Sequence, residues 1–114
     1  MEDLLIEKLS SLDYEVRLQG SLLPNEPYPD SFFTFWNNSS ESESYYDNKE
    51  NAIVYNYDVN FYSNNPEKVY SVVRDAINLL KDYGFIISGD GYSVPSDEKT
   101  HDGRGFEATF IKYL

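Results

Sequence analysis

The chain has 114 residues, of which 40% are hydrophobic and 17% aromatic, as expected for one domain with a modest core. Its net charge of −11 is uneven: residues 1–50 contain eleven acidic and three basic residues, whereas residues 51–114 contain nine and six. This field repels phosphate, which disfavours sequence-specific nucleic-acid binding and adsorption to an anionic membrane. The absence of cysteine excludes disulfides, thiolate nucleophiles and cysteine zinc sites.

The N-terminal part predicts a helix over residues 2–12, because Leu5, Leu9 and Leu12 fall on one helical face. No basic segment precedes its leucines, so no signal peptide is expected, and no apolar run approaches the roughly 20 residues of a membrane span. Alternation of apolar and polar residues then predicts a strand over 14–19.

Three prolines within residues 24–29 make the following connection extended and unsuited to a central strand. The aromatic run over 31–36 predicts a second strand. Residues 37–50 are polar and acidic, which predicts a long loop. This loop is either a solvated hairpin tip or an arm that becomes ordered on a partner, with Tyr45 and Tyr46 as anchors.

The clearest pattern is an alternating strand over residues 53–62, antiparallel to 31–36, followed by an amphipathic helix. Asn65 is suited to cap this helix, Pro66 to begin it and Gly84 to end it in a left-handed conformation. The residues expected on the strand's second face are Val54, Asn56, Asp58, Asn60 and Tyr62. Those of the apolar helix stripe are Val69, Val72, Val73, Ala76, Ile77 and Leu80.

The C-terminal part predicts a strand over 85–88, a long polar loop over 94–104 and a final strand over 105–113. The expected fold is therefore a single α+β domain spanning 1–114, in the order α-β-β-β-α-β-β. Its sheet would be mostly antiparallel, with both helices packed on one face. The other face would be rich in tyrosine and exposed unless a second subunit covers it, which favours an oligomer.

The only histidine, His101, lies in the segment Thr100-His101-Asp102-Gly103-Arg104-Gly105. An adjacent histidine and aspartate fit a general base or a metal ligand. However, the sequence has no nucleophile-elbow motif and no further ligands at a useful spacing. The glycines indicate a turn before the last strand, so His101 is interpreted as a turn residue.

Four acidic residues in neighbouring loops raise the possibility of a divalent-cation site: Asp90, Asp97, Glu98 and Asp102. The sequence around Asp90 lacks the alternating ligands of a calcium loop. It also lacks the lysine and helix start of a phosphate loop. A carboxylate pair for glycoside hydrolysis would converge from distant positions, and no pattern favours one. We therefore expect a protein without enzyme activity, with no catalytic, cofactor-binding or metal-binding residues.

Charge has two further interpretations. The acidity either confers solubility, with the charge placed on loops, or forms a surface that repels or imitates DNA. In addition, the basic residues Lys99, Arg104 and Lys112 lie towards the C-terminus, whereas residues 1–50 are strongly acidic. In a ring, such complementary flanks would orient one subunit against the next.

The layout of the whole chain resembles the small tail-terminator and tail-completion proteins of long-tailed bacteriophages. The features that carry the resemblance are Pro27-Tyr28-Pro29, the alternating strand over 53–59, the helix from Pro66 to Leu80, and Tyr83-Gly84-Phe85. The resemblance spans most of the chain and is one of element order, without an invariant signature.

This resemblance implies that the chain is not an enzyme. It would be one subunit of a homo-oligomer, a hexameric ring of about six copies. The ring would stop growth of the tail tube and join the tail to the head connector. Its partners would be the tail-tube and head–tail connector proteins. Its location would be the host cytoplasm during assembly and then the virion tail.

The alternative function is that of a small acidic inhibitor that imitates DNA, of the anti-restriction or anti-CRISPR type. This hypothesis explains the charge and the small size of the chain. It gives no role to the long loop or to the exposed aromatic faces. For the structural function, the candidate interface residues are Glu41, Glu43, Tyr45, Tyr46, Asp47, Asn56, Asp58 and Tyr62.

Overall fold

The computed structural model describes residues 2–18, 28–46, 49–96 and 98–113, with only the backbone for 39–46 and 49–51. Its elements follow the predicted order α-β-β-β-α-β-β. They are α1 (Glu2–Ser10), β1 (Glu15–Leu18), β2 (Ser31–Tyr46), β3 (Lys49–Ser63), α2 (Pro66–Asp82), β4 (Tyr92–Val94) and β5 (Asp102–Tyr113). The molecule is elongated, with extents of 53 × 28 × 22 Å.

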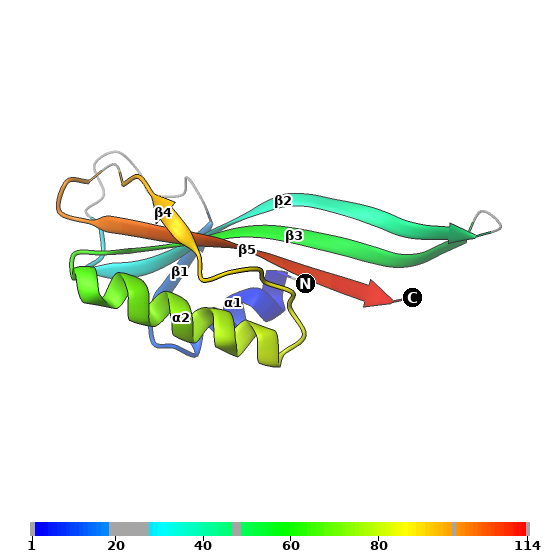
Figure 1. Cartoon of the computed structure of the whole chain (residues 1–114), viewed down its shortest axis with the longest axis horizontal. Coiled ribbons are helices and arrows are strands. Elements are labelled where there is room, and N and C mark those ends of the chain that lie inside the picture. Colours follow the sequence, from blue (N-terminus) through cyan, green and yellow to red (C-terminus); the bar gives the residue numbers. More distant parts are fainter. Residues whose placement is uncertain (1, 19–27, 47–48, 97, 114) are drawn as a thin grey trace.

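The five strands form one sheet in the order β1-β2-β3-β5-β4. The β2–β3, β3–β5 and β4–β5 pairs are antiparallel, and only β1 runs parallel to its neighbour β2. Both helices lie on the same side of the sheet (Figure 1). The predicted α+β class, the mostly antiparallel sheet and the packing of the helices on one face are therefore confirmed.

The helix α2 begins and ends at the residues that its sequence predicts. The Asn65 side chain accepts a hydrogen bond of 3.1 Å from the amide of Glu67, and Pro66 occupies the first helical position. At the other end Gly84 has a φ of +96°. The amides of Gly84 and Phe85 donate to the carbonyls of Lys81 and Leu80, which makes this end a Schellman motif.

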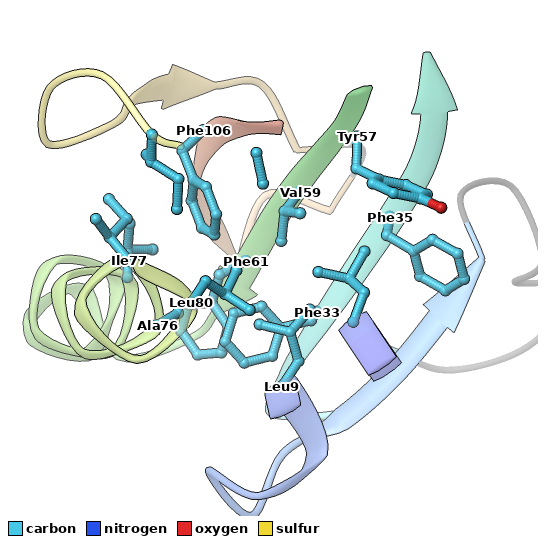
Figure 2. Close-up of a cluster of buried hydrophobic side chains, with 14 of the residues drawn as sticks. Leu9, Phe33, Phe35, Tyr57, Val59, Phe61, Ala76, Ile77, Leu80 and Phe106 are labelled. Atoms are coloured by element: carbon cyan, nitrogen blue, oxygen red, sulfur yellow. The ribbon is translucent and has the colours of Figure 1, made fainter. Parts of the chain in front are cut away.

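The hydrophobic core lies between the helices and the inward-facing side chains of the three central strands (Figure 2). Tyr57, Val59 and Phe61 alternate along β3 and are almost completely buried. The predicted stripe of α2 packs against them, and all six of its residues are buried. Helix α1 adds Leu5 and Leu9 to the same core.

The predicted loop over residues 37–50 is wrong. Strand β2 continues to Tyr46 and β3 begins at Lys49, so that the two form a long hairpin with paired residues out to the Tyr46–Lys49 pair. A register shift between Asn37 and Ser39 marks a β-bulge in β2. The segment is polar because it lies beyond the helices, where the sheet has no core to cover (Figure 1).

The predicted strand over 85–88 is also wrong, because Ile86 forms only an isolated bridge to Thr109. The fourth strand lies instead at Tyr92–Val94, after the turn at Gly89 and Gly91, both of which have positive φ. The loop predicted over 94–104 is shorter than expected, because β4 includes its first residue and β5 begins at Asp102.

No helix in the described part of the chain is both long and apolar enough to cross a membrane.

Candidate interaction surface

The side of the sheet that faces away from the helices, here called the outer face, is covered by neither helix (Figure 1). Its Phe32 end is buried, whereas the part around Trp36 is open. Alternation along the strands places on it Trp36 of β2, Asp58 of β3 and Glu107 of β5, which are neighbours in the register. Trp36 is 52% exposed. A large aromatic side chain on an uncovered sheet face is a candidate contact for another protein.

Three predicted interface residues of β3, namely Asn56, Asp58 and Tyr62, lie on this outer face. They are all partly buried rather than exposed. The Asn56 side chain accepts a hydrogen bond of 2.8 Å from the hydroxyl of Thr109 across the strand. Tyr62 stacks on Phe32 with ring centroids 5.4 Å apart. The side chains of Asn56 and Tyr62 therefore already make contacts between neighbouring strands of the sheet.

The other predicted interface residues belong to the β2–β3 hairpin. Glu41 and Glu43 are opposite Val54 and Ala52 in the register, and Tyr45 and Tyr46 form the last described pairs of β2. Asp47 lies outside the described residues. The backbone thus brings these β2 residues together with the outer β3 residues in one strand pair.

The far half of the sheet has two open edges. β1 pairs with β2 only from Phe32 to Phe35, so in the described chain β2 from Trp36 onward has β3 as its only neighbour. β5 pairs with β4 and, at Thr109, with Ile86; beyond Thr109 its only partner among the described residues is β3. Residues 36–46, 49–56 and 109–113 therefore form a three-stranded extension, here called the arm. Open strand edges offer unpaired main-chain groups to another chain.

An acidic cluster lies where the arm meets the body of the sheet. Asp58 and Glu107 are directly opposite each other on β3 and β5, which puts two carboxylates side by side. Burial raises the pKa of the nearby Tyr92 phenol, and the charges of Asp58 and Glu107 raise this pKa further. The cluster gives the outer face a local negative potential.

A small aromatic cluster closes the opposite end of the outer face around His101. This side chain is 9% exposed, and its Nε2 donates a hydrogen bond of 2.8 Å to the carbonyl of Pro29. Its ring packs edge-on against Tyr28 and Phe32. His101 lies in the turn before β5, as predicted. It joins this turn to the segment that enters β2.

The prediction missed the exposed Trp36 and Tyr92 and the carboxylate Glu107. The alternation of the aromatic run over 31–36 separates Trp36 from Phe33 and Phe35, but it places Trp36 on the same face as the buried Phe32 and so does not indicate its exposure. No signal exists for Tyr92 either, because its strand is only three residues long. The described residues contain no group of three or more histidine, aspartate or glutamate side chains that would hold a metal ion.

No protein-family model matches this chain, and no curated protein matches its sequence.

Proposed function

We propose that this chain is a structural subunit of a long-tailed phage or prophage tail. Copies of the chain assemble into a ring that terminates the tail tube and joins it to the head connector. The observation that carries the proposal is the arm, which has open edges and extends beyond the helices (Figure 1). The choice of a tail-terminator ring as the assembly rests on the resemblance of the element order to that of tail terminators.

The open part of the outer face, around Trp36 and along the arm, also supports assembly. Trp36 is half-exposed there, and Tyr113 at the end of the arm is 78% exposed. Aromatic side chains of this kind are enriched in protein interfaces because they bury a large area with few rotatable bonds. Contact with another subunit would remove this area from water.

The charge of the arm favours a ring over a symmetric dimer. Glu41 and Glu43 lie on the open edge strand β2, and antiparallel pairing of two such edges would bring like charges together. A contact between different surfaces of neighbouring copies avoids this repulsion. Such a heterologous contact closes into a ring when its rotation is suitable.

Size-exclusion chromatography with light scattering, over a range of concentrations, tests the proposal. The chain is expected to form an assembly of about six subunits, either alone or after addition of tail-tube protein. A chain that stays monomeric under both conditions and competes with DNA for a nuclease would contradict it.

The second candidate is the DNA-mimic inhibitor, which the elongated shape and the net charge favour. Duplex DNA carries one negative charge per 1.7 Å, so a 53 Å length would carry about 31 charges. The whole chain has 20 acidic residues, and 9 basic residues offset part of their charge. The chain therefore has a lower charge density than duplex DNA of the same length. For this reason DNA mimicry is the second candidate function and the tail subunit the first.

A further inference from the structure

A pocket of about 380 Å³ lies at the end of the molecule where α2 begins. Its walls come from the first turn of α2, from β4 and the residues after it, and from the start of β5. The apolar part includes Val69, Val94 and Pro95, and the polar part includes Ser96 and Arg104. Its volume is large enough to take one or two side chains of another protein.

Arg104 is the fixed positive charge of this pocket. Its Nε and Nη2 atoms donate hydrogen bonds of 3.1 to 3.3 Å to the carbonyls of Asp90 and Gly91. Its guanidinium also lies 4.9 Å from the centre of the Tyr70 ring. All these partners are uncharged, so they orient the side chain without neutralising it.

No carboxylate in the described chain forms an ion pair with Arg104. Asp102 also lines the pocket, but it is exposed and lies farther from the guanidinium than the 4.0 Å of an ion pair. The Nη1 atom donates no hydrogen bond to the described residues, so its two N–H groups are free for a ligand. A fixed guanidinium with free N–H groups is suited to bind a carboxylate.

A carboxylate-rich segment of the same chain lies at the opposite end of the molecule. Residues 41–50 contain four acidic residues and one lysine. The register sets the Tyr46–Lys49 pair at one end of the β2–β3 ladder and Ser63, just before α2, at the other. The Tyr46–Lys49 end of the hairpin and the start of α2 are accordingly at the two ends of the long axis in Figure 1.

We propose that the Arg104 pocket binds the acidic end of the arm of a second copy of this chain. One copy places Glu41 or Glu43 against the guanidinium of the next, so that the subunits join head to tail. Complementary charge argues for this occupant, since a chain with a net charge of −11 has few surfaces that attract an acidic segment. The inference rests on the proposed ring and names its contact.

Charge exchange in the full-length chain tests the contact. Arg104→Glu alone and Glu41→Arg with Glu43→Arg are each expected to abolish the ring in light scattering, and the triple variant is expected to restore it. Arg104→Lys retains the charge without the planar fork and should weaken assembly less than Arg104→Glu. Lys81→Glu makes the same charge change in the last turn of α2, and this control should still assemble.

Restoration by the triple variant cannot arise from misfolding, and circular dichroism of each variant checks the fold. A ring that forms with Arg104→Glu would overturn the inference while leaving the proposed function intact. Folded single variants that fail to assemble, followed by a triple variant that also fails, would overturn it too.

A second measurement does not require a ring. A fluorescent synthetic peptide of residues 39–51 is titrated with the full-length chain, and its anisotropy is followed. Arg104→Gln is expected to weaken its binding about tenfold or more, as loss of a charge-assisted pair predicts. A control peptide has the four acidic residues replaced by their amides. It should bind the unaltered chain as weakly as the acidic peptide binds Arg104→Gln.

Equal binding of the acidic and neutral peptides would exclude the carboxylate contact, as would equal binding by the unaltered chain and Arg104→Gln. Peptide binding by a chain that never assembles on tail-tube protein would support the pocket and contradict the ring. Failure of the inference and failure of the proposed function are therefore distinguishable.

Discussion

The end of α2 depends on a single residue, Gly84. Its φ of +96° lies in the left-handed region, where a side chain is strained. A Cβ placed there would also lie 3.4 Å from the Phe110 ring, which is ordinary contact. The strain is therefore conformational rather than steric.

Gly84→Ala is expected to lower the free energy of unfolding by about 1–2 kcal/mol, the usual cost of a left-handed non-glycine residue. Urea unfolding followed by circular dichroism measures this change. Asn78→Ala, on the exposed surface of the same helix, is the control and should not lower stability. Equal stability of Gly84→Ala and the unaltered chain would show that the Schellman motif does not constrain this end.

Tyr57 is a buried phenol near the N-terminus of α1. Burial, and to a smaller extent the nearby charge of Glu2 and the Tyr55 phenol, together raise its pKa from 10.0 to about 12. The folded state therefore retains the proton at a pH where the unfolded chain loses it. The stabilisation is complete below pH 10 and is lost as the pH rises through about 12.

The unaltered chain should consequently lose stability between pH 10 and about 12 more steeply than Tyr57→Phe, which has no proton to lose. Urea midpoints of the two chains, measured at several pH values across this window, test the difference. Parallel pH profiles would contradict the assignment of the raised pKa to Tyr57.

The arm contributes no described residue to the buried core cluster, although Tyr55 and Phe110 at its base pack against it. Most of the core cluster lies between Phe33 and Phe35, between Tyr57 and Phe61, and in the two helices. Ala52 is the one residue of 43–52 whose side chain the structure describes, and it is buried but lies outside the core cluster. Ser42 and Ile53 are directly paired, so a two-residue turn can join them.

Replacing residues 43–52 with Asn-Gly should therefore preserve the fold, with a change of about 1 kcal/mol or less in the free energy of unfolding. Thermal and urea unfolding, with near-ultraviolet circular dichroism to report aromatic packing, measure the outcome. A shortened chain without a cooperative transition would show that the hairpin is part of the folding unit.

For the whole molecule, the sequence predicts those features that depend on local pattern. The alternation of β3, the stripe of α2 and the caps at Asn65 and Gly84 are of this kind, and they define the central strand and the helix that covers it. The predicted order agrees with the structure, but the sequence predicts its sixth element at 85–88, whereas this element lies at Tyr92–Val94. The strand over 37–46 has no such pattern, because an extension outside the core needs no apolar alternation. Its residues are ordered by pairing with β3, a non-local interaction.

The pocket is beyond sequence analysis for a similar reason. Arg104 is recognisable as a base near the C-terminus, but its uncharged partners at Asp90 and Gly91 come from a turn thirteen or fourteen residues away. Only the fold shows that its charge is left free for a partner. The three-residue strand β4 likewise depends on tertiary pairing with Gly103–Gly105.

The central claim is that the arm joins copies of this chain into a ring, and the mass of the shortened chain tests it most directly. In light scattering, either alone or with tail-tube protein whose own mass is subtracted, the unaltered chain should contribute about six times the subunit mass of 13.2 kDa. The folded chain in which Asn-Gly replaces residues 43–52 should remain at one subunit mass. Identical assemblies from both chains, or a single subunit mass for both, would contradict the claim.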